Sequence, residues 1–308
     1  MPTPARFAHV VGPSGAAVDL YEGDALEGLP EVARPGTVDC VVTSPPYNLG
    51  VAYGRYDDDR PRGEYIRWVG RAADAVDRVL AADGSFFLNL GASPSDPWLP
   101  WDVAREVGQR FRLQNVIHWV KSIAIDRELA GRSAGLDRDL AVGHYKPLKS
   151  RRFLHSGHEY VFHFTREGNV ELDRLAVGVP YQDASNVARW RSSGANRRCR
   201  GNTWFLPYRT IRFREKDRPH PAAFPVELPE RCFRLHGVQR IRLAADPFVG
   251  IGASAVAAWR LGLPFIGFDI DRAYLRSAVD ALHGAEPPPS QLRTSRSHLR
   301  RRTSAAPP

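Results

Sequence analysis

Residues 38–48 read VDCVVTSPPYN, a short apolar run that ends at two consecutive prolines. The run from Val38 to Thr43 is mostly apolar, with Val41 and Val42 on opposite sides, which predicts a strand buried on both faces, as in a parallel sheet. Pro45 and Pro46 hold φ at about −65° and carry no amide proton, so they favour a rigid turn over a continued strand. We therefore expect a central strand whose carboxyl end leads directly into a proline turn.

Short apolar runs alternate with longer amphipathic runs along the rest of the chain. In Glu64 to Leu80, apolar residues recur at steps of three and four, which predicts a helix with one buried face. The other expected helices are Trp98 to Arg110, Ala253 to Leu261 and Arg272 to Leu282. The other expected strands are Ser85 to Leu90, Leu113 to Val120, Glu159 to Phe164, Ile241 to Ala245 and Pro264 to Phe268. This alternation is typical of an α/β domain with helices on both faces of a mostly parallel sheet.

Two segments lack this periodicity. Ser122 to Arg152 is rich in Gly, Arg, Asp and Lys, and we expect a long mobile loop there. Glu171 to Arg218 combines basic and aromatic side chains, a composition suited to contact with phosphates and bases. Its candidate nucleic-acid contacts are Arg189, Trp190, Arg191, Arg197, Arg198 and Arg200. Residues 285–308 are rich in Pro, Ser and Arg, and we expect them to form a disordered basic tail.

The composition narrows the class of protein. The chain has 308 residues, with 43 Lys and Arg against 34 Asp and Glu, and its formal net charge of +9 favours a polyanionic partner. The three cysteines, Cys40, Cys199 and Cys232, are too scattered for a disulfide framework or a zinc site, which indicates a reduced, cytoplasmic protein. Because no stretch approaches the roughly 20 apolar residues of a membrane span, we expect neither secretion nor membrane insertion.

The proline turn Ser44 to Tyr47 lies where α/β domains bind ligands, at the carboxyl end of a strand. The Ser44 hydroxyl and the Pro45 carbonyl can accept the two hydrogens of a planar amino group, which would aim the nitrogen lone pair at an electrophile. Tyr47 has the aromatic ring needed to stack on an unstacked base. The alternative is a structural turn that only ends the strand.

A second pattern points to a nucleotide-like ligand. Residues Asp246 to Gly252 read DPFVGIG and connect an expected strand to an expected helix. Gly250 and Gly252 allow the backbone to approach a ligand closely, and Asp269 ends the next expected strand, where a carboxylate accepts hydrogen bonds from ribose hydroxyls. This unit predicts the binding of an adenosine moiety. A nicotinamide or flavin enzyme stays open, with Ala255 at the third glycine position, but it does not explain the Ser-Pro-Pro-Tyr turn.

An ordered set of motifs accompanies these two patterns. In chain order they are Gly23-Asp24, VDCVVTSPPYN (38–48), GSFFLNLG (84–91), VIHWVKS (116–122), GHEYVFHFTR (157–166), GNTWFLPY (201–208), HPAAFPVELPERC (220–232), DPFVGIGAS (246–254) and FIGFDID (265–271). Over most of residues 18–283 the chain resembles the β-class DNA amino-methyltransferases, the N4-cytosine and N6-adenine family, in which the catalytic tetrapeptide precedes the glycine-rich cofactor turn. The resemblance implies one catalytic domain with a Rossmann-like, S-adenosylmethionine-dependent methyltransferase fold. Its sheet would have seven mostly parallel strands with one antiparallel strand, and helices on both faces.

The resemblance also implies roles for individual residues. The target base would be held by Ser44, Pro45, Pro46 and Tyr47. The cofactor would be S-adenosyl-L-methionine, with Asp269 on its ribose and Asp24 near its adenine amino group. The full set of implied cofactor contacts is Asp24, His220, Ala222, Phe224, Asp246, Pro247, Phe248, Gly250, Gly252, Ser254 and Asp269. Double-stranded DNA is the implied partner, while a restriction endonuclease of the same system and a second copy of the chain remain open.

The implied reaction is methyl transfer to the exocyclic N4 of a cytosine flipped out of the helix. Ser44 favours cytosine, because relatives with Asp at this position mostly act on adenine; adenine N6 is the alternative target. Carbon-5 methylation is not expected, since it typically needs a cysteine after a proline, and the three cysteines follow Asp39, Arg198 and Arg231. A nicotinamide-dependent oxidoreductase and an inactive DNA-binding module are the alternatives from other classes.

Overall fold

The structure is a computed structural model that describes residues 4–12, 14–51, 53–131, 136–143, 150–181, 187, 196–207 and 224–285. Its strands are β1 (Ala5–Val11), β2 (Ala17–Glu22), β3 (Val38–Thr43), β4 (Leu80–Leu90), β5 (Arg112–Val120), β6 (Ile123–Ile125), β7 (Leu140–Val142), β8 (His158–Thr165), β9 (Thr203–Phe205), β10 (Ala244–Asp246) and β11 (Phe265–Asp269). Its helices are α1 (Ala25–Val32), α2 (Arg62–Val79), α3 (Leu99–Val107), α4 (Arg127–Ala130), α7 (Glu227–His236), α8 (Ala253–Leu261) and α9 (Arg272–His283), with a 3-10 turn at Val238–Arg240.

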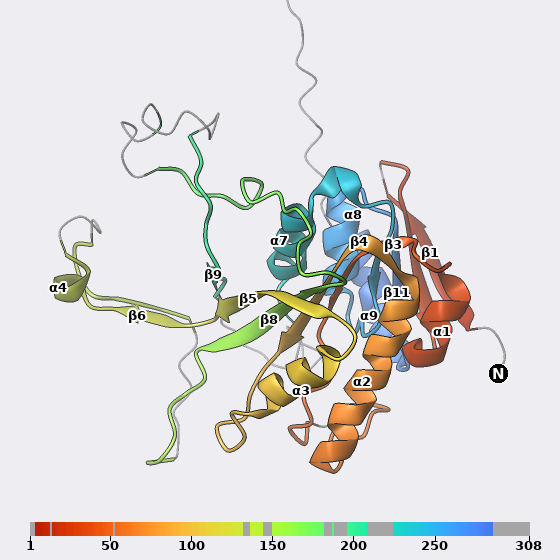
Figure 1. Ribbon diagram of the computed structural model, residues 1–308, viewed down its shortest axis with the longest axis horizontal. Coiled ribbons are helices and arrows are strands. Elements are labelled where there is room, and N and C mark those ends of the chain that lie inside the picture. Colours follow the sequence, from red (N-terminus) through yellow and green to blue (C-terminus); the bar gives the residue numbers. More distant parts are fainter. Residues whose placement is uncertain are drawn as a thin grey trace, which may run out of the picture.

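Nine strands of the described chain form one sheet in the order β1-β2-β11-β10-β3-β4-β8-β5-β9 (Figure 1). Strands β2, β11, β10, β3 and β4 are parallel, and β8 runs antiparallel to both β4 and β5. The part from β2 to β5 is therefore the expected seven-stranded sheet with one antiparallel strand. Two edge strands are added, because β1 pairs antiparallel with β2 and β9 pairs parallel with β5. The sequence pattern missed both, since β1 is largely exposed and β9 has only three residues.

Helices cover both faces of the sheet (Figure 1). On one face α1, α2 and α3 pack through a buried cluster that includes Val69, and on the other α7, α8 and α9 pack through a cluster that includes Phe233. All six residues of β3 are buried, and Val41 and Val42 belong to opposite clusters. The prediction of a strand covered on both sides is thus confirmed. Within the described ranges, no helix is long and apolar enough to cross a bilayer.

Three segments differ from the sequence prediction. The strand expected at Ile241 to Ala245 is limited to β10, because the Ile241 amide donates to Val238 and closes the 3-10 turn. The apolar pattern does not predict α7, which contains Pro229 in its first turn, where the missing amide proton costs no helical hydrogen bond. The described part of residues 122–152, expected as a loop, contains α4 and an antiparallel β6–β7 hairpin.

Candidate active site and cofactor cavity

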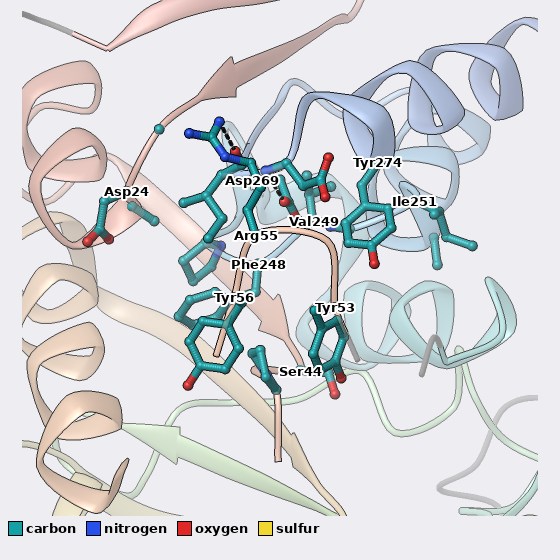
Figure 2. A pocket seen from close by; sticks show the side chains of 18 of the residues that line it. Asp24, Ser44, Tyr53, Arg55, Tyr56, Phe248, Val249, Ile251, Asp269 and Tyr274 are labelled. Atoms are coloured by element: carbon teal, nitrogen blue, oxygen red, sulfur yellow. Dashed lines mark hydrogen bonds between the residues drawn. The ribbon is translucent and has the colours of Figure 1, made fainter. Parts of the chain in front are cut away.

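Three parallel strands bring the two sequence patterns to one edge of the sheet. Strands β3, β10 and β11 are consecutive neighbours, so Ser44 after β3, Asp246 at the end of β10 and Asp269 at the end of β11 share the carboxyl edge. A cavity of about 990 Å³, part of it open to solvent, lies against this edge. Figure 2 shows Asp24 on one side of the cavity and Tyr274 on the other. The expected catalytic and cofactor segments therefore meet in one space.

The structure separates residues that face this cavity from residues that hold its wall. The expected site residues in the lining are Asp24, Ser44, Pro46, Phe224, Pro247, Phe248, Gly250 and Asp269. The expected residues described by the structure but outside the lining are Pro45, Tyr47, Asp246, Gly252 and Ser254. His220 and Ala222 lie outside the described residues, as do Arg189, Trp190 and Arg191.

Asp246 is a buried support of the glycine-rich turn. It is 1% exposed, and its carboxylate accepts hydrogen bonds from the Thr43 hydroxyl (2.5 Å), the Ser254 hydroxyl (2.5 Å) and the Phe248 amide (2.9 Å). Burial raises the pKa of Asp246 to about 6, and the three hydrogen bonds oppose that rise. These bonds tie the end of β3 and the start of α8 to the turn. Asp246 and Ser254 therefore shape the cavity from behind its wall.

Two glycines of the turn serve different contacts. Gly250 has a φ of 51°, and its amide donates to Asp269 Oδ2 at 3.0 Å. Gly252 has a φ of 88°, and a Cβ on it would lie 2.7 Å from the Cβ of Ala278 on α9. Left-handed φ values favour glycine, and the second position also has no room for a side chain. Gly252 thus allows the close packing of α8 on α9, whereas Gly250 lines the cavity.

Asp269 places a carboxylate in the cavity wall. The amides of Gly250 (3.0 Å) and Asp271 (2.7 Å) donate to it, which fixes its orientation. Burial raises the pKa of Asp269 to about 6, so the group is mainly ionised at neutral pH. A carboxylate has about four acceptor sites, and two remain for hydroxyl groups of a ligand.

The loop that follows the proline turn closes part of the cavity. Buried Asp58 accepts the amides of Asn48 (2.8 Å), Leu49 (3.0 Å) and Val51 (3.0 Å). Asn48, with a φ of 57°, accepts from the Arg60 amide and donates to the Arg60 carbonyl, both at 2.8 Å. The loop residues held in the cavity wall by this network are Tyr53, Arg55, Tyr56 and Arg60.

Sequence reasoning missed this loop. Asp58 stands in a run of three aspartates, which by pattern alone is a solvated turn, and only the folded chain buries the middle one. Burial also raises the pKa of Tyr56 to about 12, so its phenol is neutral. The Tyr56 ring lies 5.2 Å from that of Trp68, which in turn lies 5.2 Å from Phe248. These tilted rings give the cavity an aromatic wall.

The tetrapeptide divides between the cavity and the protein interior. Ser44 and Pro46 line the cavity, and the Pro46 carbonyl accepts from the buried Tyr65 hydroxyl at 2.7 Å. The Tyr47 hydroxyl lies 2.6 Å from Ser44 Oγ and donates to Glu159 Oε2 at 2.9 Å. In this state Tyr47 packs partly buried against the core and is outside the cavity lining, so stacking of its ring on a base stays a prediction.

Glu159 on β8 is a further site residue that sequence reasoning missed. It is 7% exposed and accepts hydrogen bonds from Tyr47, from Asn89 Nδ2 at 2.8 Å and from Lys121 Nζ at 2.8 Å. Asn89 Nδ2 is also 2.6 Å from the Tyr47 hydroxyl. A charged residue inside the apolar run HEYVFHF was the available signal, because a buried carboxylate needs partners. The network connects Glu159 to Ser44 through Tyr47.

Three of the expected nucleic-acid contacts are described. Arg197 Nη2 donates to the Gly178 carbonyl at 2.8 Å, and Arg200 Nε donates to the Val177 carbonyl at 2.9 Å. The backbone of Arg198 forms an antiparallel bridge with Val179. The described residues 177–179 and 197–200 of this segment are therefore paired with each other, and Arg197 and Arg198 are exposed.

Comparison with known proteins identifies the family. A family model described as DNA methylase matches residues 38–280, which is most of the chain. The chain belongs to this family. This DNA methyltransferase is 26% identical to the Type II methyltransferase M.BglII of Bacillus subtilis over 282 residues, which covers 86% of this chain and 69% of that protein. The nicotinamide-dependent alternative is thereby removed.

Solved structures share the fold of the DNA methyltransferase. The PvuII DNA methyltransferase (cytosine-N4-specific) superimposes with a TM-score of 0.60 at 19% identity, covering 90% of this chain and 86% of that one. TTHA0409, a putative DNA modification methylase from Thermus thermophilus in complex with S-adenosyl-L-methionine, has a TM-score of 0.54 at 22% identity, with 85% and 92% covered. Both likenesses establish the Rossmann-like methyltransferase fold.

S-adenosyl-L-methionine is the cofactor of this DNA methyltransferase, and the cavity has the chemistry that fits it. The ligand combines a planar adenine, a ribose with two hydroxyls and a cationic sulfonium. The cavity offers the rings of Trp68 and Phe248, and the carboxylates of Asp24, Asp269 and Asp271. Aromatic faces and carboxylates attract a cation, and the carboxylates also accept hydroxyl protons.

Proposed function

We propose that this DNA methyltransferase methylates the exocyclic N4 of a cytosine that is flipped out of double-stranded DNA. The observation that carries the proposal is the position of the Ser44 hydroxyl, which faces the cofactor cavity and is hydrogen-bonded through Tyr47 to Glu159. Ser rather than Asp at this position resembles the cytosine N4 branch. The PvuII enzyme is named cytosine-N4-specific, but at 19% identity its likeness concerns the fold, so the choice of base rests on Ser44.

The cavity between the glycine-rich turn and the loop that follows the proline turn would hold the cofactor. Asp269, whose carboxylate is fixed by the Gly250 and Asp271 amides, would accept its ribose hydroxyls. Phe248 would contact its adenosine portion and Asp24, on the opposite side of the cavity from Tyr274, would approach its adenine amino group (Figure 2). When bound, the cofactor would supply a methyl group activated by a sulfonium.

The Ser44 hydroxyl is oriented to accept a hydrogen bond from the target amino group. Tyr47 has a single hydroxyl proton, and it donates this proton to Glu159. The 2.6 Å contact between Ser44 and Tyr47 must then be donated by Ser44. Asn89 Nδ2 donates to Ser44 Oγ at 3.4 Å, which leaves one lone pair of that oxygen for the amino group. An acceptor at that point directs the nitrogen lone pair towards the methyl group.

The same chain of hydrogen bonds stabilises the charge that develops on nitrogen. Positive charge would grow on the amino group as its bond to the methyl carbon forms and the methyl–sulfur bond breaks, with the electron pair left on sulfur, and one amino proton would then leave to water. The buried Glu159 carboxylate would act on this charge through Tyr47 and Ser44. Without substrate, the Lys121 ammonium, whose Nζ lies 2.8 Å from Glu159 Oε1, balances the negative charge of this buried carboxylate. The protein therefore contributes positioning and electrostatics, and no side chain of the chain needs to form a covalent intermediate.

The proposal is tested by incubating unmethylated genomic DNA with S-adenosylmethionine carrying an isotopic methyl label, followed by mass spectrometry of the nucleosides. We expect labelled N4-methylcytosine. If only labelled N6-methyladenine is found, methyl transfer to an exocyclic amino group is retained, but cytosine is not the target base. A Ser44→Ala variant, which should bind the cofactor normally, provides the matched control for background label.

The relatives support a further point about partners. M.BglII is named a Type II methyltransferase. We propose that this protein likewise protects a short DNA sequence against a restriction endonuclease of the same system. DNA methylated by the protein should then resist one such endonuclease and remain sensitive to others.

A further inference from the structure

We propose that a second cavity, between α7 and the paired residues 176–179 and 197–200, binds a backbone phosphate of the DNA substrate. This arginine cavity has an empty volume of about 500 Å³ and is lined by Arg197, Arg200, Arg231 and Arg234 together with Glu227 and Glu230. The inference rests on the proposed function only in taking double-stranded DNA as the substrate.

The charge of the arginine cavity suits an anion. Four guanidinium groups face two carboxylates, and Glu230 is paired within α7 to Arg234 at 2.9 Å. A guanidinium carries five N–H donors, and the bonds from Arg197 and Arg200 to backbone carbonyls each use one of them. Those two bonds also hold both arginines at the cavity. The planar fork of donors matches the oxygens of a phosphate.

Arg231 is the group that points most directly to a missing ligand. Its Nη1 is buried and has no hydrogen-bond partner in the structure as described. Burial and the neighbouring charge of Arg200 lower the pKa of Arg231, which means that the site disfavours the bare cation. Buried donors are almost always satisfied in folded proteins, so an unpartnered guanidinium nitrogen at an arginine-lined cavity is best explained by an anion that binds there.

The arginine cavity lies close to the cofactor cavity. Phe224 lines the cofactor cavity, and Glu227, three residues later, lines the arginine cavity. Three residues span at most about 11 Å. Because the two cavities come this close to each other, a DNA strand that delivers a base to the cofactor cavity can also contact the arginine cavity.

The arginine cavity also joins the catalytic domain to the segment expected to read DNA. The Asp173 amide donates to the Leu235 carbonyl of α7 at 2.8 Å, and Val179 pairs with Arg198. Figure 1 shows this green part of the chain beside α7. A phosphate held here would fix the register of DNA between the base-reading segment and the active site, as phosphate contacts do in other DNA-binding proteins.

The test is the salt dependence of DNA binding by full-length Arg231→Met, measured by fluorescence anisotropy with a labelled duplex. Loss of one phosphate contact should weaken binding about tenfold and reduce the slope of log affinity against log salt by about one. The thermal midpoint of the free variant should equal or exceed that of the wild type, because an unpartnered buried charge has been removed. Arg231→Lys should restore most of the binding.

Arg78→Met is the matched control, since Arg78 is exposed in the last turn of α2, and α2 leads into the amino end of β4, away from the active site. A salt slope for Arg231→Met equal to that of this control would overturn the proposal. A second outcome would also overturn it: inorganic phosphate raises the thermal midpoint of the wild type, while Arg231→Met binds DNA as the wild type does. That result would assign the cavity to a small phosphate ligand. If the labelling experiment yields no N4-methylcytosine, the proposal that cytosine N4 is the target is overturned. The test of phosphate binding by Arg231 does not depend on that result.

Discussion

At the scale of single residues, the proposed catalytic group is the Ser44 hydroxyl, whose direction is set by a distant carboxylate. Because Tyr47 donates its own proton to Glu159, its oxygen accepts a hydrogen bond from Ser44, and Ser44 can in turn accept one from the substrate. Glu159 is separated from Tyr47 by 112 positions in the chain. It acts through Tyr47 and is a positioning residue.

The first prediction concerns Glu159→Gln. The change keeps the shape of the side chain and removes its charge, so kcat should fall about a hundredfold while the dissociation constant of S-adenosylmethionine stays the same. Single-turnover kinetics and calorimetric titration measure the two quantities. Exposed Glu167→Gln is the control. Wild-type turnover in Glu159→Gln would remove Glu159 from the mechanism.

The second prediction concerns Asp269 and pH. Its pKa in the free protein is about 6, and the ionised form is the better acceptor for ribose hydroxyls. Cofactor affinity should therefore be constant above pH 6 and fall as the pH drops below 6, by about tenfold per pH unit. Asp269→Asn should bind more weakly and show a flatter dependence. Calorimetric titration of the cofactor at several pH values measures both affinities. If the affinities of wild type and Asp269→Asn change with pH in parallel, Asp269 is not the group whose ionisation controls cofactor binding.

At the scale of elements, the loop after the proline turn is held by one buried carboxylate. Three backbone amides donate to Asp58, so its replacement leaves all three without their acceptor. Asp58→Ala should loosen the loop, increase its cleavage by protease and weaken cofactor binding about tenfold. Exposed Asp59→Ala should do neither. Equal protection of the loop in both variants would argue against this role.

Two buried histidines link the sheet to α7. His163 on β8 and His236 on α7 both contact the Ser85 hydroxyl, at 3.0 and 2.9 Å. Burial lowers the pKa of His163 to about 3 and that of His236 to about 4. Both are neutral in the folded protein, so the stability they contribute is present above about pH 6.5 and is lost as the pH falls towards 4.

The expected slope is about 1.4 kcal/mol per pH unit for each histidine over that range. Asp246 and Asp269 act in the opposite direction, because their raised pKa values let the folded protein bind protons between pH 6 and 4. The measurable quantity is therefore the difference between wild type and His236→Asn in urea unfolding at pH 7.5 and pH 5. The variant should lose less stability on acidification. An identical loss would show that His236 is not neutral in the folded state.

At the scale of the whole molecule, one sheet carries two cores. Val41 and Val42 are neighbours on β3, yet they are buried in clusters on opposite faces. We expect both clusters to unfold together, because every central strand contributes to each. Val41→Ala and Val42→Ala should each lower the free energy of unfolding by roughly 2 kcal/mol and retain a single transition by fluorescence and by circular dichroism. Separate transitions would mean that the two layers are independent.

The sequence by itself determined the central strands, the order of the motifs and the two turns that carry them. Val38 to Thr43 and DPFVGIG are local patterns, because burial on both faces, proline and glycine each act within a few residues. This was sufficient for the class of fold, the family and the cofactor. It also selected Ser44, Phe248 and Asp269 as site residues, and the structure brings these three to one cavity.

Only the tertiary structure decided which of the expected residues face the ligand and which support them. Asp246 and Ser254 lie behind the cavity wall, and only folding buries Asp58 and brings Arg231 of α7 beside Arg197 and Arg200. The physical reason is that burial and hydrogen-bond direction depend on partners far apart in the chain. Strand register and helix packing bring those partners together, and no local pattern records them.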